Sequence, residues 1–153
     1  MNGEIGGFGL SVLLRASATF PVGLAIEAFA DDADPFDFPD IKIADIAMGL
    51  NGDMVSWSKA TPLLTNIALI AESDDDNNMA VLLAANRVGK SKQSARDVLT
   101  LIGQYPSGAI VTLSNGKLTD GAISNSISSA GRMKSKVYKM AFQNITISRV
   151  GLT

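Results

Sequence analysis

The sequence predicts a mainly β fold, a sandwich or barrel of antiparallel strands with one flanking α-helix. Two observations lead to this prediction. Six to eight short segments either alternate apolar with polar residues or are rich in Ile, Leu and Val, and both patterns are typical of strands. Only one segment, residues 74–87, combines helical spacing with helix-start signals. With 153 residues the chain is long enough for one domain, residues 1–153, with its own core.

The N-terminal part is expected to contain a leader and two strands. Residues 3–9 include four glycines, so residues 1–9 are expected to form a flexible leader. Residues 8–14 alternate apolar residues with smaller or polar ones, which predicts a strand. Residues 22–28 are predicted to form a second strand that carries its larger apolar side chains on one face.

The segment 29–40 is predicted to be an acidic loop. It contains two prolines and five aspartates, which exclude both a helix and a ladder of strand hydrogen bonds. It also contains Phe29, Phe36 and Phe38, which is unusual for a solvated loop. These aromatic residues indicate that the loop docks, either onto its own domain or onto a neighbour.

A hairpin is expected in the middle of the first half of the chain. The pair Asn51-Gly52 accepts the positive φ angles of a tight turn. It joins a predicted strand over residues 41–48 to a returning strand over residues 54–58. Another strand is predicted over residues 64–71.

One helix is predicted over residues 74–87. Ser73 is a good N-cap, and Asp74, Asp75 and Asp76 fall in the first turn, where the helix dipole favours negative charge. Asp76 stands three residues after Ser73, an arrangement that resembles a capping box. One face of this helix carries Met79, Leu82, Leu83 and Asn86, and Gly89 marks the end.

The C-terminal part is predicted to contain a basic linker and further strands. The linker covers residues 88–96, and the strands are expected over residues 98–102, 109–113 and 137–147. Asn115-Gly116 predicts a second hairpin turn. A serine-rich segment, residues 124–136, leads into the last strand.

The charges are sorted by half. Residues 1–80 hold thirteen acidic and three basic residues, and residues 81–153 hold ten basic and two acidic residues. A chain with complementary halves can bind copies of itself head to tail, and such contacts build rings or filaments. The alternative is one small domain whose charges are merely solvated.

The composition argues against an enzyme. The chain has no Cys and no His, so it lacks disulfides, thiolate chemistry and the commonest general base and metal ligand. Apolar residues make up 46% and charged residues 18%, which places surplus apolar surface at subunit interfaces. We expect no cofactor.

No membrane insertion is expected either. The N-terminus lacks the basic region of a signal peptide, and Arg15, Pro21 and Glu27 interrupt the apolar segment 8–29.

Three patterns could indicate a ligand, and each has a simpler explanation. Asp32-Ala33-Asp34 begins like a calcium loop, but Pro35 and Phe36 break the pattern, so no metal site is assigned. Asp74, Asp75 and Asp76 are explained by helix capping. Gly89-Lys90-Ser91 matches only the tail of a P-loop and follows a helix instead of preceding one.

The basic stretch 132–136 could contact phosphates, or it could pair with an acidic surface of a neighbouring copy. Arg132, Lys134 and Lys136 supply its charge, and the alternation places both lysines on one strand face. Only one aromatic residue, Tyr138, follows closely, whereas nucleic-acid sites usually interleave several. Pairing between copies is the favoured interpretation.

Several motifs together resemble a known family. They are Thr19-Phe20-Pro21-x-Gly23, the loop Phe29 to Phe36, Gly49-Leu50-Asn51-Gly52-Asp53, Glu72-Ser73-Asp74-Asp75-Asp76, Ser114-Asn115-Gly116-Lys117-Leu118-Thr119, and Ser129-Ala130-Gly131-Arg132-Met133-Lys134-Ser135-Lys136. In this order the set resembles the tail tube proteins of contractile-tailed bacteriophages, from about residue 18 onward.

The resemblance implies a structural virion protein. Six subunits would form a ring, and stacked rings would form a tube inside a contractile sheath, assembled in the host cytoplasm and delivering DNA. The implied partners are further copies of the chain and the sheath, baseplate and tape-measure proteins. DNA would pass through the lumen without specific binding.

The contacts between subunits are expected to use two segments of opposite charge. The acidic loop would supply aromatic area and register, and the basic stretch would meet it. The candidate residues are Phe29, Asp31, Asp32, Asp34, Phe36, Phe38, Arg132, Lys134 and Lys136. Two rival functions are a baseplate or adaptor ring that assembles once per virion, and a small metal- or nucleic-acid-binding module.

Overall fold

The computed structural model describes residues 9–31 and 33–149, and it confirms a mainly antiparallel β fold with one helix. The predicted leader, apart from Gly9, and the candidate residue Asp32 lie outside the described residues. The elements are β1 (Ser11–Ala16), β2 (Phe20–Ile26), β3 (Phe36–Asp37), β4 (Ala44–Met48), β5 (Met54–Ser58), β6 (Leu63–Leu69), α1 (Asp74–Asn86), β7 (Leu99–Gln104), β8 (Ile110–Asp120) and β9 (Lys136–Ser148).

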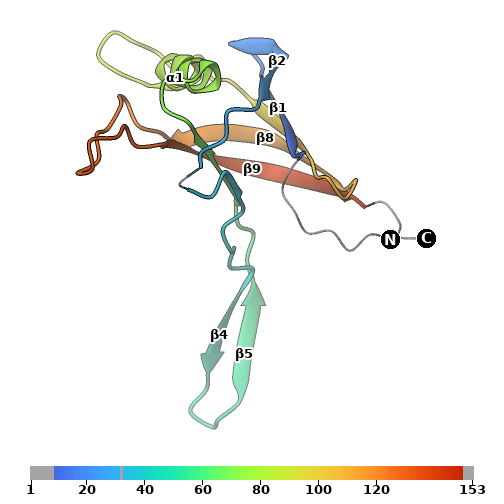
Figure 1. Cartoon of the computed structure of the whole chain (residues 1–153). Helices are drawn as coiled ribbons and strands as arrows, with labels where there is room; N and C mark the ends of the chain where they lie inside the picture. Colours follow the sequence, from blue (N-terminus) through green and yellow to red (C-terminus); the bar gives the residue numbers. More distant parts are fainter. Residues whose placement is uncertain (1–8, 32, 150–153) are drawn as a thin grey trace.

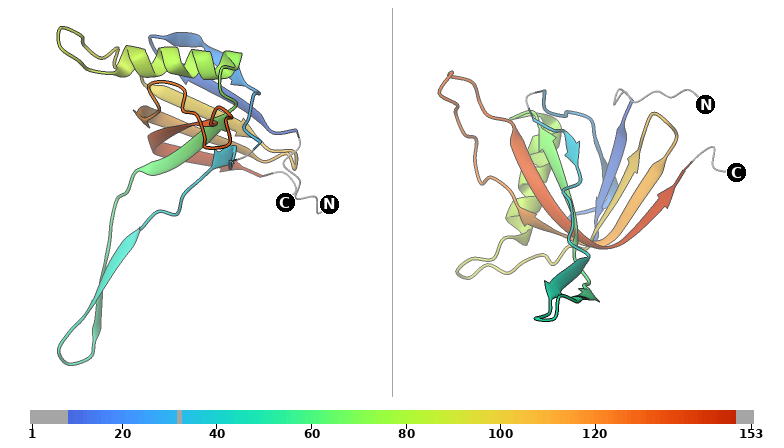
Figure 2. Two further views of the ribbon diagram at one scale, coloured as in Figure 1. Left: turned by 60° about the vertical axis from the view of Figure 1, so that its left-hand side comes forward. Right: turned by 90° about the horizontal axis from the view of Figure 1, so that it is seen from below.

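Seven of the strands form one sheet in the order β2-β1-β7-β8-β9-β6-β3, and all neighbours are antiparallel. The sheet curves strongly, so that its two ends face each other in the view from below (Figure 2). Helix α1 lies over one end of the sheet, and the separate β4–β5 hairpin projects from the opposite side (Figure 1). The strands therefore form a half-open barrel in place of two stacked sheets.

The core lies on the inner face of this curved sheet. Alternate side chains of each strand point inward, which explains the buried sets in β1 and β9. From α1, Met79 and Leu82 are fully buried against the sheet. The largest fully buried side chains include Tyr138, Phe142, Leu14, Ile67, Leu101 and Leu113.

Helix α1 begins as the sequence predicts. The Ser73 side chain accepts a hydrogen bond from the Asp76 backbone N–H at 3.2 Å, so Ser73 is the N-cap. Asp75 has a further role, because its Oδ2 accepts from the backbone N–H groups of Glu27 and Ala28 at 2.7 and 2.8 Å. The first turn thereby fastens the end of β2 to the helix.

The two Asn-Gly pairs have different outcomes. Asn51-Gly52 forms the predicted turn, and Gly52 has a φ of 89°. The second hairpin prediction is wrong, because Asn115 and Gly116 lie inside the continuous strand β8. Asn115 takes a φ of 54° at a bulge, where the register of β8 against β7 shifts between Leu99 and Leu101. The preference of this dipeptide for positive φ is met by a bulge in place of a turn.

Replacing Gly116 with alanine should strongly destabilise the fold. A Cβ at this position would lie 2.2 Å from the ring of Phe142, a buried core residue that cannot move aside. We expect a loss of about 1–3 kcal/mol in the free energy of unfolding, measured by urea denaturation. Gly89→Ala is the control, since its Cβ would meet only the flexible side chains of Arg87 and Lys92, at 3.4 and 4.0 Å. Equal midpoints for the two variants would contradict this packing argument.

The prediction that residues 29–40 form no strand pairing is wrong in two places. Phe36 and Asp37 form the short strand β3, paired with Ile67 and Asn66 of β6, and Phe29 makes an isolated bridge to Leu69. Pro35 does not prevent this, because its carbonyl accepts a hydrogen bond from the Ala68 N–H at 3.0 Å. Proline lacks an N–H donor but keeps its carbonyl acceptor, so it is compatible with an edge strand.

A buried carboxylate joins three separate segments. Asp97 is 3% exposed. Its Oδ1 accepts from the backbone N–H groups of Ala18 and Thr19, and its Oδ2 accepts from the Thr19 hydroxyl and the Asn86 amide. Burial by itself would raise the pKa of Asp97, but these hydrogen bonds outweigh it and hold the pKa below the ordinary value.

This network predicts an acid-sensitive component of stability. A carboxyl with a lowered pKa in the folded state stabilises the fold above its unfolded pKa of about 3.9, and this contribution is lost as pH falls through the folded value. Asp97→Asn should cost about 2 kcal/mol at pH 7, because its amide would meet the Asn86 amide donor. The difference from the parent should shrink below about pH 4. A difference that stays constant from pH 7 to pH 2 would contradict this account.

Candidate assembly interface

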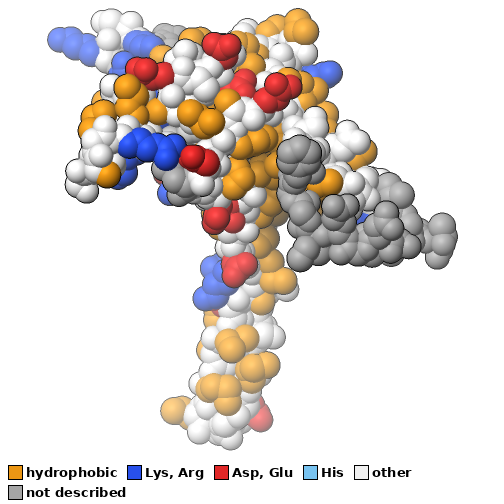
Figure 3. Space-filling view, in the orientation of Figure 1, with side chains coloured by type: hydrophobic (Ala, Val, Ile, Leu, Met, Phe, Trp, Pro, Cys, Tyr) orange, Lys and Arg blue, Asp and Glu red, His pale blue; other side chains and the backbone are white. Residues whose placement is uncertain are grey.

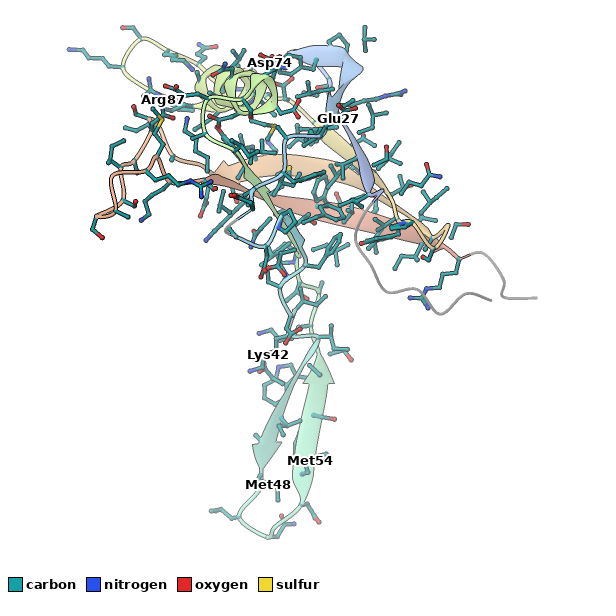
Figure 4. The ribbon with its side chains drawn as sticks, viewed as in Figure 1. Glu27, Lys42, Met48, Met54, Asp74 and Arg87 are labelled. Carbon is teal, nitrogen blue, oxygen red and sulfur yellow. The ribbon has the colours of Figure 1, made fainter. Side chains whose placement is uncertain are left out.

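The most exposed part of the structure is the arm, which we define as residues 41–60. It consists of β4, β5 and the turn between them, and it extends away from the sheet (Figure 1). Every residue of the arm except Asp45 is exposed. Met48 and Met54 lie at its far end and Lys42 near its root (Figure 4). An isolated two-stranded hairpin is marginally stable in water, so the arm needs a further surface.

Both faces of the arm carry apolar side chains. The pairing of Met48 with Met54 and of Ile46 with Ser56 places Ile46, Met48 and Met54 on one face. They are 66%, 66% and 61% exposed. The opposite face carries Val55 and Trp57, which are 56% and 51% exposed. Apolar side chains therefore follow the arm in the space-filling view (Figure 3). Contiguous exposed apolar surface of this kind marks an interaction site.

Polar contacts at the root of the arm join its two strands to each other. Asp45 forms ion pairs with Lys42 at 2.5 Å and with Lys59 at 3.0 Å. Hydrogen bonds to Lys42, and then to Lys59, lower the pKa of Asp45. The Lys59 N–H donates to the Ile43 carbonyl at 2.8 Å. These contacts hold the two strands in register without tying the arm to the sheet.

An apolar groove of about 390 Å³ lies beside the root of the arm. We use "the groove" for the hollow lined by Phe38, Pro39, Ile41, Leu63, Leu64, Tyr105, Ala109, Val111, Leu113, Ile145, Ile147 and Arg149. Arg149 is its single charged residue. Burial raises the pKa of Tyr105 in its wall. The β9 residues Ile145 and Ile147 remain 41% and 50% exposed there, so this wall of the groove is open to a partner.

The three candidate phenylalanines pack within the chain. Phe29, Phe36 and Phe38 are half-buried and pack against the core cluster. The ring of Phe36 lies 4.9 Å from that of Phe38, edge to face, and 6.2 Å from that of Tyr105. The loop is expected from its sequence to dock either onto its own domain or onto a neighbour, and in the structure its aromatic residues pack onto their own domain. Only Phe38 also lines the groove.

One predicted acid–base pair forms inside a single chain. Asp31 accepts a hydrogen bond from Arg132 at 2.7 Å, and this contact lowers the pKa of Asp31. Both side chains are largely exposed. Asp34 and Lys134 are also exposed, and the Lys134 backbone N–H donates to the Ser126 carbonyl at 2.7 Å. Lys134 precedes β9, so it does not share a strand face with Lys136 as the sequence alternation suggested.

Lys136 is not on the surface. Its side chain is 8% exposed and its Nζ lies 3.4 Å from Asp76 Oδ2, while the Tyr138 hydroxyl donates to Asp76 Oδ1 at 2.8 Å. Burial, and then the neighbouring Asp76, raises the pKa of Tyr138 well above the ordinary value. The Lys136 ammonium thus neutralises a buried carboxylate between α1 and β9. We therefore leave Lys136 out of the contact surface.

The arm and the groove are not evident from the sequence. Both strands of the arm are predicted from it, but their separation from the main sheet is not. One signal was present: Pro39 and Pro62 bracket the segment, and only Asp40, Lys42, Asp45, Asp53 and Lys59 are charged between them. The groove combines residues from four distant parts of the chain, so no local pattern could reveal it.

Two features are absent from the residues that the structure describes. No group of three or more carboxylates there is arranged to hold a metal ion. No helix in the described ranges has the length and apolar character needed to cross a membrane.

The comparisons with known proteins give a family and a fold. The family model of the tail fiber protein gp32 matches residues 3–146. No curated protein matches the sequence. A chain of the sheath–tube complex of the extracellular contractile injection system PVC, in its extended state, is 9% identical with a TM-score of 0.59, and the match covers 98% of this chain and 95% of that one.

Two other solved structures share the fold. A chain of the tube-terminating cap of the anti-feeding prophage is 10% identical with a TM-score of 0.55, covering 98% of this chain and 94% of that one. A chain of the PVC sheath/tube terminator is 10% identical with a TM-score of 0.50, covering 95% and 96%. The resemblance to tail tube proteins is thus confirmed at the level of a tail-protein family and a shared fold.

Proposed function

The chain belongs to the tail fiber protein gp32 family, and from this membership, together with the fold it shares with a chain of a sheath–tube complex, we propose that it is the repeating tube subunit of a contractile phage tail. In this proposal, residues 1–153 form one tube-like domain, six copies form a ring, and the rings stack. The tube is a conduit for DNA, which passes without specific binding. The sheath surrounds it, and the baseplate and tape-measure proteins are further partners in the virion.

The arm is the observation that carries this proposal. It exposes apolar side chains on both faces, and it projects from the sheet on the side opposite α1. Burying one such side chain contributes about 1.5–3 kcal/mol. A chain that assembles only sideways would leave this surface in water. Contact between an arm and a copy in the next ring covers it and gives the stack one direction, because each interface is heterologous.

The charges support contacts between copies as well. Glu27 and Asp74 lie near the N-terminal end of α1, and Arg87 lies at its other end (Figure 4). Residues 88–96, which follow Arg87, add Lys90, Lys92 and Arg96 and contain no acidic residue. Opposite charges at the two ends of α1 suit head-to-tail contact between neighbours in a ring. From the original candidates we retain Asp31, Asp34, Phe38, Arg132 and Lys134 as exposed or partly exposed contact residues.

Two rival functions lead to different particles. A cap, baseplate or adaptor ring stops after one ring, and the fold shared with a chain of the anti-feeding prophage cap supports this rival. A fibre component, as the family description has it, forms slender rods without a lumen.

Negative-stain electron microscopy of the purified chain, over a concentration series at moderate salt, tests the proposal. Long hollow tubes with a regular axial repeat are expected above a critical concentration. Single rings at every concentration would favour the cap or adaptor, and solid rods would favour the fibre. A monomer at every concentration would contradict self-assembly of the chain.

A further inference from the structure

We propose that the groove seats the far half of the arm, residues 46–57, from a second copy of the chain. This inference rests on the proposed function and goes beyond it, because it assigns the surface that receives the arm. Two exposed apolar surfaces then cover each other across two copies: the arm of one copy is inserted, and the groove of the other receives it.

The arm cannot fill its own groove. Ile41, Leu63 and Leu64, at the root of the arm, form part of the groove wall. From that root the strands stay paired in a continuous ladder from Ala44–Ser58 to Met48–Met54. Eight or nine residues of extended strand place the turn about 25–30 Å away from the root. The far half of the arm can therefore reach only another copy.

The apolar chemistry of the two surfaces matches. Ile46, Met48 and Met54 form a strip on one face of the arm, and eleven of the twelve groove residues are apolar or aromatic. A volume of about 390 Å³ accepts a few side chains and not a whole domain. Methionine adapts well to irregular apolar hollows, because its unbranched side chain has three rotatable bonds. A flat strip of such side chains suits a shallow, open groove.

The charges of the two surfaces also match. Asp53 is the only charged residue between residues 46 and 57, and Arg149 is the only charged residue of the groove. Asp53 is exposed in the turn, where its Oδ2 accepts from the Asn51 amide at 2.9 Å. Arg149 is also exposed. Seating the arm brings one anion to one cation, which fixes the direction of insertion.

Site-specific cross-linking tests the contact without interference, because the chain contains no cysteine. Met48→Cys and Ile147→Cys are purified separately, mixed, assembled and treated with a short bifunctional maleimide. Since each variant has one thiol, a mixed cross-link forms only between copies. Mixing Met48→Cys with Val22→Cys is the matched control, because Val22 is 89% exposed and does not line the groove.

The expected result is at least a tenfold higher yield of the mixed dimer for the Met48/Ile147 pair than for the control pair. Equal yields in samples that form tubes would overturn the groove assignment and leave the proposed function standing. A parent chain that forms no tubes would overturn both.

A charge exchange provides a second test that introduces no thiols. Asp53→Arg and Arg149→Asp should each reduce tube yield at least tenfold, and the double variant should recover most of it. Single variants that assemble like the parent, or a double variant worse than both, would overturn the pairing. Both positions are exposed, so neither change should affect folding of the monomer.

Discussion

Replacing Ile46, Met48 and Met54 together with serine is expected to abolish tube formation while leaving the fold intact. The three side chains lie on one face of the arm and are largely exposed, so the core does not depend on them. If each is buried on assembly, the variant loses about 4.5–9 kcal/mol of apolar burial per copy. Because every copy in a ring carries the change, the critical concentration for tube formation should rise above the concentrations at which the protein can be prepared. Sedimentation and negative-stain microscopy provide the measurement.

The matched control replaces three exposed apolar residues elsewhere, Val22, Val81 and Val88, with serine. This control removes a similar amount of exposed apolar surface from β2, from α1 and from the basic linker, residues 88–96. It should form tubes at concentrations close to those of the parent. If the control and the arm variant polymerise equally well, general hydrophobicity and not the arm drives assembly.

Asp76→Ala is expected to cause a large loss of folding stability. The change leaves the Lys136 ammonium buried without a counter-charge, and it removes the carboxylate oxygens that accept from the Tyr138 hydroxyl and the Glu72 N–H. Removing one partner of a buried ion pair typically costs about 3–5 kcal/mol. Urea denaturation followed by circular dichroism measures this loss as a lower midpoint with an unchanged slope.

Asp74→Ala is the control for this substitution. Asp74 lies in the same first turn of α1 but is exposed, so it contributes only through the helix dipole. We expect a change of about 0.3–1 kcal/mol for that variant. Similar losses for both variants would show that the helix dipole, and not the buried pair, makes Asp76 important.

The elements of the fold could be predicted where local chemistry decides them. Ser73 and the aspartates after it define the start of α1, and Asn51-Gly52 defines the tip of the arm. The alternation in β9 identified the last strand within one residue at either end. The hairpin turn predicted at Asn115-Gly116 is a bulge in the structure, because a bulge and a hairpin turn can both require a residue with positive φ.

The candidate site was harder to predict, because burial depends on the whole fold. Phe36 and Lys136 both have sequence features of a contact residue, yet one packs beside Phe38 and Tyr105 and the other pairs with buried Asp76. The sorting of charge between the two halves is partly satisfied inside one chain, through pairs such as Asp31–Arg132. The arm was missed because its alternating sequence is that of any half-buried strand.

The most direct test of arm-mediated stacking is a cryo-electron microscopy map of the assembled chain, at a resolution that traces the β4–β5 hairpin. We expect every arm to cross a ring boundary, with Met48 and Met54 against a copy in the next ring and β9 of that copy beside them. Arms that stay within their own ring, or that project freely into the lumen or the solvent, would contradict this stacking contact.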